Sequence, residues 1–211
     1  MDVSSKSVRG SIHPYEDRVL VDEKLGLFAV ADGVTGSSQG SGAIAAELAL
    51  ELLREGYAGD IVEAMREVHR TVYRRRLNDR SIGETTLTAA AVKGNLLRVG
   101  NLGDSPAYLV RGGRMRSLII GDISPLGYIT QVVGCPEIVK VHTQEAQLQK
   151  GDLAIVASDG VGHVLNPSFV VPLASESNAD RIAERIVEEA RLAVTDYDDD
   201  KSVIVLRVLE G

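Results

Sequence analysis

Residues 25–33 constrain the fold of this 211-residue chain more than any other stretch. A mostly apolar run leads there without interruption into Asp32 and Gly33. Such a run is typical of a strand that is covered on both faces. A carboxylate at the end of a buried strand is costly unless something positive meets it. Asp32 therefore has two interpretations: a turn residue, because Asp-Gly is a common turn dipeptide, or a ligand of a cation.

Four other strand-like segments also carry acidic residues at one end. They are 15–21 with Glu16 and Asp17, 96–105 with Asp104, 153–160 with Asp159, and 196–208 with Asp198, Asp199 and Asp200. If these ends converge, like charges so close together cannot all stay ionised without cations between them. Hard divalent metals with oxygen ligands meet that requirement.

The residues themselves suggest how two ions would be held. Asp32 is the expected bridge between them, because it is buried up to its last atom, and Asp159 and Asp199 would complete the shell of one ion. Gly33 can offer its backbone carbonyl at close range, since no side chain blocks a metal there. For each acid the alternative is a turn or cap residue. Asp198 or Asp200 could also replace Asp199 in this role.

Composition favours one domain over residues 1–211, with 44% hydrophobic residues and a formal net charge of −7. The only block of basic residues is 74–76, which we interpret as a solvated helix face; a short basic patch that helps phosphopeptides to dock stays open. Extended nucleic-acid binding is not expected. We find no signal-peptide pattern and no apolar run near the ~20 residues that span a bilayer, so we expect a cytoplasmic protein that does not enter membranes.

Hydrophobic periodicity predicts antiparallel sheet and helices in an α+β layering. Strands are expected at 3–12, 18–21, 25–32, 85–92, 95–102, 107–111, 114–119, 139–148, 153–158 and 202–209, and helices at 43–55, 61–77 and 178–194. We interpret 85–119 as one meander. The first helix is expected to bury Ile44, Leu48 and Leu52. The small residues of 33–42 are interpreted as a flexible connection, since no Gly-Lys-Ser/Thr of a nucleotide P-loop follows.

Six motifs stand in a familiar order. They are Tyr15-Glu16-Asp17-Arg18, Phe28-Ala29-Val30-Ala31-Asp32-Gly33, Gly83-Glu84-Thr85-Thr86, Asn101-Leu102-Gly103-Asp104-Ser105-Pro106-Ala107-Tyr108, the pattern from Leu148 through Gly151-Asp152 to Ser158-Asp159-Gly160, and Asp199-Asp200-Lys201-Ser202-Val203-Ile204. In this order the chain resembles the type-2C, metal-dependent serine/threonine protein phosphatases from about residue 9 to its end. Each motif is weak singly, but six in the family's order are strong.

The resemblance implies a four-layer αββα sandwich of two antiparallel sheets flanked by helix pairs, with a binuclear Mn²⁺ or Mg²⁺ centre at one end. It also implies a role for each matching position. In this family pattern Asp32 bridges the ions, Gly33 gives its carbonyl, and Asp159 and Asp199 hold one ion. Asp17, with Glu16 beside it, binds or orients metal-bound water on the other side. Asp104 with Asp159 matches the site of a third, weaker ion in bacterial members.

Three departures from the family pattern bear on the chemistry. Ile12 stands where the family usually has an arginine that grips the substrate phosphate, and Arg9 or Arg18 is the nearest replacement. Residues 34–37 lack the histidine segment that follows the family's Asp-Gly. The stretch 120–136 is short, so the flap subdomain is expected to be reduced and the metals more open.

The leading hypothesis is a phosphatase of phosphoserine and phosphothreonine in proteins, acting by direct attack of metal-bound water. Asp32 and Asp17 are the expected catalytic residues, and His13 is a weaker candidate for protonating the leaving group. Phosphoprotein substrates, a partner kinase and a monomeric state are expected. The alternatives are a regulatory binding module with the phosphatase fold but poor catalysis, and a phosphatase of small molecules.

Overall fold

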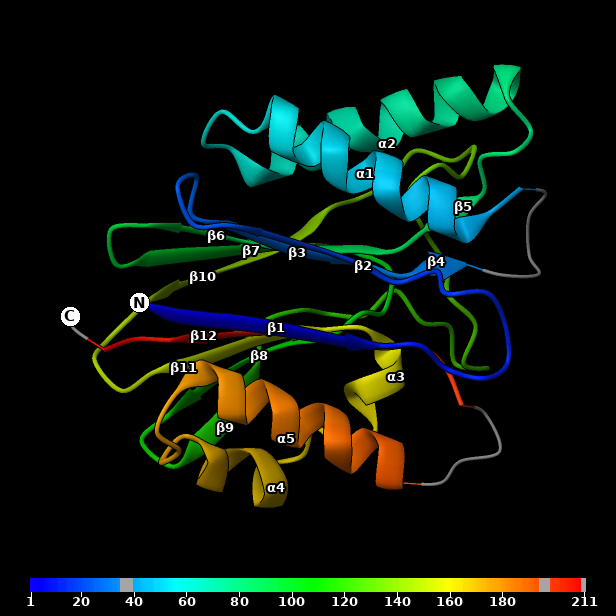
Figure 1. Ribbon diagram of the computed structural model, residues 1–211. Coiled ribbons are helices and arrows are strands. Elements are labelled where there is room, and N and C mark those ends of the chain that lie inside the picture. Colours follow the sequence, from blue (N-terminus) through cyan, green and yellow to red (C-terminus); the bar gives the residue numbers. More distant parts are fainter. Residues whose placement is uncertain (35–39, 194–197, 210–211) are drawn as a thin grey trace.

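The computed structural model describes residues 1–34, 40–193 and 198–209, and two antiparallel sheets lie face to face within it (Figure 1). The first sheet has the order β1-β12-β11-β8-β9, with β1 (Asp2–Val8), β12 (Lys201–Arg207), β11 (Leu153–Ala157), β8 (Ala107–Arg111) and β9 (Arg114–Ser117). The second has the order β10-β7-β6-β3-β2, with β10 (His142–Gln147), β7 (Leu96–Leu102), β6 (Leu87–Lys93), β3 (Leu27–Ala31) and β2 (Arg18–Asp22). A short ribbon pairs β4 (Gly33–Val34) with β5 (Glu84–Thr85).

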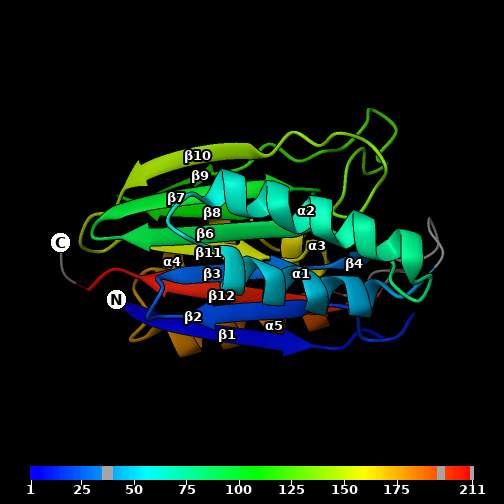
Figure 2. The ribbon, with the colours of Figure 1, turned by 90° about the horizontal axis from the view of Figure 1, so that it is seen from above.

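Helices cover the outer face of each sheet, which confirms the expected αββα layering (Figure 1). On the second sheet, α1 (Gly42–Gly56) and α2 (Ile61–Asn78) lie side by side (Figure 2). On the first sheet lie α4 (Pro167–Leu173) and α5 (Ala179–Leu192), with the short α3 (Asp159–Gly162) at one end. Asp60 caps α2 by accepting hydrogen bonds from the N–H groups of Val62 and Glu63. No helix within the described ranges is long and apolar enough to cross a membrane.

The strand β3 is covered on both faces, as its continuous apolar run predicts. Leu27, Ala29 and Ala31 belong to the hydrophobic layer under α1 and α2. Phe28 and Val30 belong to the layer between the two sheets. All five side chains are fully buried. The carboxylate of the next residue therefore emerges at the end of a rigid, completely packed strand.

The predicted buried stripe of α1 was wrong in part. Ile44 is 43% exposed and Leu52 is only partly buried, although Leu48 is buried as predicted. The helix instead rests on the sheet through a face made largely of alanines, Ala45, Ala46 and Ala49, together with Leu53. Alanines let the helix backbone approach the sheet closely, and the periodicity of large apolar residues does not reveal such a face.

The predicted meander over 85–119 was also wrong. The strands β6 and β7 belong to one sheet, whereas β8 and β9 belong to the other. The chain crosses between the sheets at 103–106, where Gly103 takes a φ of 104° that favours glycine. The prediction also began β3 too early, since Leu25 and Gly26 lie in the preceding turn, and it missed α3 and α4.

This topology brings distant segments to one end of the sandwich. The C-terminal end of β3, the N-terminal ends of β2 and β12, and α3 all lie at the end away from the two termini (Figure 1). The acidic residues next to these ends are therefore neighbours in space although they are far apart in the sequence.

Candidate metal centre

The backbone of Asp32 is fixed by two threonines of the 83–86 motif. The carbonyl of Asp32 accepts hydrogen bonds from Thr86 N at 2.8 Å and from Thr85 Oγ1 at 2.9 Å. The N–H of Asp32 donates to Thr86 Oγ1 at 3.1 Å, and that hydroxyl also bonds Ser105 Oγ at 2.8 Å. These bonds use only the backbone of Asp32, so its carboxylate remains available to interact with the charged groups around it.

The structure brings Asp32 together with three of the other acids that the sequence singles out. The pKa of Asp32 is raised well above its usual value, first by removal from water and then by repulsion from Asp17, Asp159 and Asp199. A side-chain hydrogen bond with Asp159 raises the pKa further. The convergence of these carboxylates, which was expected from the strand ends, is thus present. Their roles as metal ligands stay a prediction.

Asp17 is the most deeply buried of these acids, with 1% of its surface exposed. Burial raises its pKa to about 7, although hydrogen bonds from Ser158 and Ser202 oppose the shift. Ser158 Oγ donates to Asp17 Oδ2 at 2.7 Å, and Ser158 Oγ also accepts from Ser202 N at 3.0 Å. The motifs around Ser158 and Ser202 therefore position Asp17 beside Asp159 and Asp200.

The three consecutive aspartates of 198–200 have different partners. Asp198 pairs with Lys201 Nζ at 2.5 Å. The buried carboxylate of Asp200 accepts hydrogen bonds from the N–H groups of Gly10 at 2.8 Å, Glu16 at 2.6 Å and Asp17 at 3.3 Å. Those bonds hold the chain around 10–17, so the hydrogen bonding favours Asp199 over its two neighbours as a ligand.

Asp104 lies at the edge of the same cluster. The pKa of Asp104 is raised to about 6. Burial is the largest cause, repulsion from Asp159 comes next, and repulsion from Asp122 and Asp199 is weaker. Asp122, at the base of the short 120–136 stretch, accepts from Gly103 N at 2.9 Å and contacts His142 Nε2 at 2.9 Å. Asp122 was not among the acids singled out from the sequence; it lies in the stretch 120–136, which was interpreted only as a reduced flap.

Three buried carboxylate oxygens in this region have no hydrogen-bond partner among the described residues. They are Glu16 Oε2, Asp17 Oδ1 and Asp104 Oδ1. Buried polar atoms are nearly always paired, so orphaned oxygens call for an explanation such as an ion. Divalent cations with oxygen ligands supply the missing partner and offset the mutual repulsion of the acids. The residues present therefore fit a centre of divalent metal ions.

His13 adds a nitrogen to this acidic region. His13 Nε2 lies 3.3 Å from Asp199 Oδ1. Ligand atoms of His13, Asp199 and Asp200 all lie within 4.8 Å of one another. Because Asp200 already accepts three backbone hydrogen bonds, this trio is a poorer ion site than the cluster around Asp32. The position of His13 is compatible with its predicted role near the leaving group.

Gly33 is required by packing as well as by its predicted role as a ligand. A Cβ on Gly33 would lie 2.4 Å from the backbone carbon of Gly42, at the first turn of α1. A Cβ on Gly42 would likewise lie 2.6 Å from the backbone carbon of Gly33. The two backbones touch, which brings the N-terminal end of α1 beside the candidate centre.

Arg9 and Arg18 were the expected replacements for the missing phosphate-binding arginine. Among the described residues, neither forms a hydrogen bond or ion pair with a carboxylate of the cluster. Arg18 Nη1 donates to the carbonyls of Tyr15 at 3.3 Å and Asp17 at 2.9 Å, and its guanidinium lies over the Tyr15 ring. Arg18 therefore fixes the backbone that carries Asp17. Arg9 and Ile12 are exposed. Residues 34–37 are the segment that lacks the family's histidine, and residues 35–37 of it lie outside the described residues.

A protein-family model identifies the family to which the chain belongs. The model described as stage II sporulation protein E (SpoIIE) matches residues 22–209, which is most of the sequence. The chain belongs to the SpoIIE family. Its type-2C phosphatase fold agrees with the resemblance drawn from the motifs. None of the curated protein sequences matches this member of the SpoIIE family.

Solved structures share the same fold over nearly their whole length. PppA, a key regulatory component of T6SS in Pseudomonas aeruginosa, is 24% identical with a TM-score of 0.84, covering 97% of this chain and 96% of that one. The PPM Ser-Thr phosphatase MsPP from Mycobacterium smegmatis, in complex with cacodylate, is 25% identical with a TM-score of 0.80, covering 99% and 98%. The catalytic domain of the phosphatase PstP, in complex with 2 manganese ions, is 23% identical with a TM-score of 0.80 and the same coverage.

Proposed function

We propose that this SpoIIE-family chain hydrolyses phosphoserine and phosphothreonine in proteins with the help of Mn²⁺ or Mg²⁺. The observation that carries the proposal is the cluster of carboxylates around Asp32, in which three nearby buried oxygens lack a partner among the described residues. The likeness to MsPP supports a phosphatase, and the manganese ions of PstP support divalent metals in this fold. A phosphoprotein substrate implies a serine/threonine kinase as a functional partner.

Each acid has a proposed place in this centre. Asp32 and the carbonyl of Gly33 would hold two ions between them, and Asp159 and Asp199 would bind one of these ions. Asp17, supported by Glu16 and held by Ser158, would act on the other ion, and Asp104 would offer a weaker third position. When bound, a pair of divalent ions supplies an activated water for in-line attack on phosphorus. His13 is placed to pass a proton to the departing hydroxyl.

The test is hydrolysis of a phosphoserine peptide and of p-nitrophenyl phosphate with MnCl₂, with MgCl₂ and with EDTA. We expect turnover that requires the divalent ion. Asp32→Asn should lower kcat/KM at least about 100-fold, because a neutral amide binds divalent cations much more weakly than a carboxylate. The matched control is Asp180→Asn, an exposed aspartate on α5 that pairs with Lys6 far from the cluster. A wild type as inactive as Asp32→Asn would overturn the proposal.

The second candidate is a binding module that recognises phosphorylated proteins without turnover. The observation that favours it is Ile12, which is 45% exposed where the family usually has the phosphate-gripping arginine. In this case the wild type binds a phosphoserine peptide in the presence of Mn²⁺ but releases no phosphate. Release of phosphate from the same peptide would exclude it.

A further inference from the structure

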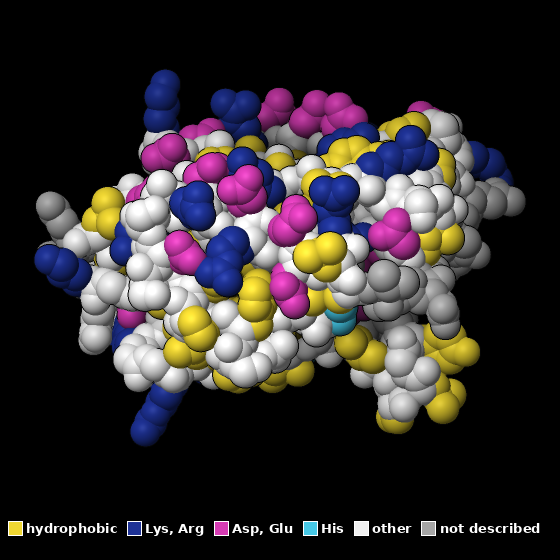
Figure 3. Space-filling view, turned by 60° about the horizontal axis from the view of Figure 1, so that its bottom comes forward, with side chains coloured by type: hydrophobic (Ala, Val, Ile, Leu, Met, Phe, Trp, Pro, Cys, Tyr) yellow, Lys and Arg dark blue, Asp and Glu magenta, His cyan; other side chains and the backbone are white. Residues whose placement is uncertain are grey.

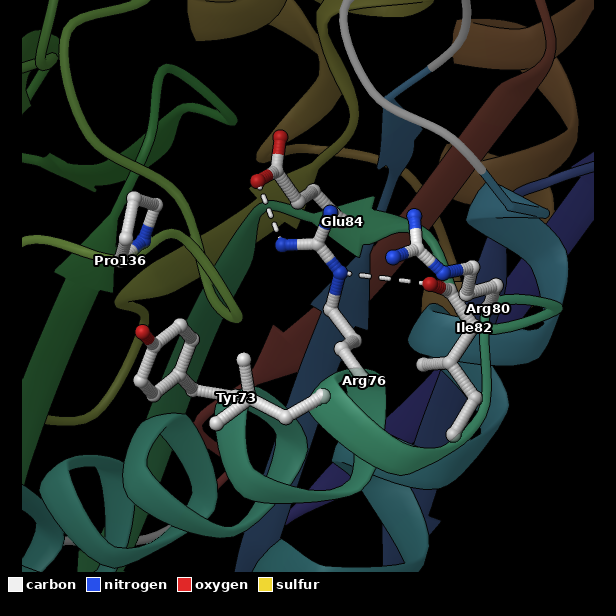
Figure 4. Close-up of a pocket in the computed structure, with 7 residues that line it drawn as sticks. Tyr73, Arg76, Arg80, Ile82, Glu84 and Pro136 are labelled. Atoms are coloured by element: carbon white, nitrogen blue, oxygen red, sulfur yellow. Dashed lines mark hydrogen bonds and ion pairs between the residues drawn. The ribbon is translucent and has the colours of Figure 1, made fainter.

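A basic groove runs along α2, on a protein whose formal net charge is −7. One cavity of about 520 Å³ is lined by Arg66, Arg70 and Arg74 on the helix and by Ile138 on the facing segment. A second cavity, of about 310 Å³, is lined by Arg76, Arg80 and Glu84 (Figure 4). Tyr73 and Pro136 line both cavities, so the two form one continuous depression, which we call the arginine groove.

The walls of the arginine groove combine positive charge with apolar surface. Five arginines and two glutamates, Glu84 and Glu137, line it. Arg66 and Arg70 pair with Glu63 and Glu67 on the same helix, and Arg76 pairs with Glu84. Arg74 forms no ion pair with the described residues. Ile138 is fully exposed and Leu77 is 66% exposed. On the face that Figure 3 shows, basic and acidic side chains are interspersed.

One end of the groove reaches the β4–β5 ribbon, next to Gly33. Figure 4 shows Arg76 reaching to Glu84, with a hydrogen bond at 2.6 Å, and to the carbonyl of Ile82 at 3.2 Å. Glu84 pairs with Val34 in the short β4–β5 ribbon, one position from Gly33. A chain lying in the groove could therefore continue toward the acidic cluster.

We propose that the arginine groove binds an acidic, extended segment of the phosphoprotein substrate, with an apolar residue seated against Ile138 and Tyr73. From Arg66 to Arg76 the helix rises about 15 Å, which spans about five extended residues. Charge complementarity favours an acidic peptide. The apolar contacts and the two glutamates in the walls disfavour a nucleic-acid backbone or an anionic lipid surface, which need a more uniform positive face. The proposal names a substrate feature and so rests on the proposed function.

The first test measures binding without catalysis. The probe is a short fluorescein-labelled peptide of Asp and Glu with a central Leu and no phosphate, titrated by fluorescence anisotropy. Arg74→Glu should raise its Kd roughly tenfold at low salt, because an attraction becomes a repulsion. Arg75→Glu is the matched control: the same charge change one residue along, outside the groove lining, should alter Kd by no more than about twofold. Ile138→Ser should weaken binding about fivefold, independently of salt.

Equal effects of Arg74→Glu and Arg75→Glu would overturn the groove as the binding site. Single-stranded RNA or anionic vesicles that displace the peptide, with the same dependence on Arg74, would overturn the acidic segment as its occupant.

A second experiment compares the hydrolysis of two phosphopeptides, one with and one without the acidic tail, and so connects the groove to turnover. The tail should lower KM and leave kcat unchanged, and Arg74→Glu should abolish only that advantage. If neither phosphopeptide is hydrolysed, the proposed function fails, while the anisotropy experiment still decides the groove.

Discussion

The role of each aspartate in this protein is set by its neighbours and not by its residue type. Asp199 and Asp200 are adjacent in sequence, yet Asp200 accepts three backbone hydrogen bonds and Asp199 lies in the acidic cluster. Burial first, and then the charge of Asp159, raise the pKa of Asp199. Asp199 Oδ1 accepts one backbone bond, from Asp200 N at 2.7 Å, whereas the three bonds to Asp200 tie its carboxylate to the 10–17 segment. Asp200 therefore stabilises a loop, and Asp199 is the stronger candidate for binding a cation.

At residue 12, restoring a cation should strengthen phosphate binding. Ile12 is exposed between Ser11, whose N–H donates to Asp198 O, and His13, which contacts Asp199. Ile12→Arg should lower KM for a phosphoserine peptide roughly fivefold, because a guanidinium forms charge-assisted bonds with phosphate oxygens. The measurement is steady-state hydrolysis with Mn²⁺, and Ile12→Gln is the uncharged control. Identical KM values for the two variants would show that the side chain does not reach the substrate.

The sequence predicted which acids come together in the cluster, but not the hydroxyls that position them. Asp32, Asp159 and Asp199 could be found because each lies at the end of an apolar run, and a strand end is readable from hydrophobic pattern. Ser158 and Ser202 belong to quoted motifs, yet their contact with Asp17 joins segments more than 140 residues apart. Such long-range hydrogen bonds leave no periodic signal, so only the folded structure reveals them.

At the scale of elements, the contact between β4 and α1 connects packing to the site. The backbones of Gly33 and Gly42 touch, so neither position has space for a side chain. The face of α1 that rests on the sheet is made largely of alanines, for the same reason of close approach. Sequence pattern predicted that α1 exists, but large apolar residues suggested a different face. Long, strongly periodic elements such as α2 and α5 were predicted to within about two residues of their observed bounds.

Gly42→Ala should therefore destabilise the protein. The new Cβ would lie 2.6 Å from the backbone carbon of Gly33, and backbone atoms cannot give way as a flexible side chain can. We expect a loss of about 2 kcal/mol in the free energy of unfolding, measured by urea denaturation. Gly56→Ala, in the same helix with nothing within 4 Å of the new Cβ, is the control and should be neutral or slightly stabilising. Equal stability of the two variants would contradict the close contact.

At the scale of the whole molecule, the sandwich gathers negative charge at one end and arginines beside it. Folding into this arrangement has an electrostatic cost, since several carboxylates lose water and approach one another. The α+β layering could be expected from the grouping of strands and helices, and the αββα sandwich from the family resemblance. The crossing between sheets at 103–106 could not, because a hairpin and a crossover begin with the same glycine-rich turn signal.

This cost makes stability depend on pH and on metal. The pKa of Asp17 is about 7 in the folded protein against an ordinary value of 3.8, so between these values the folded state holds a proton that the unfolded state has lost. The free energy of unfolding of the metal-free protein should therefore fall as pH rises through this window, with Asp17 contributing a slope of about 1.4 kcal/mol per pH. Thermal unfolding in EDTA at about pH 5 and about pH 8 measures this fall, and Asp17→Asn should reduce it. Mn²⁺ should raise Tm mainly at the higher pH, where the carboxylates are ionised and bind the cation. An equal gain at both values, or a wild-type slope that Asp17→Asn leaves unchanged, would mean that the cluster does not control this stability.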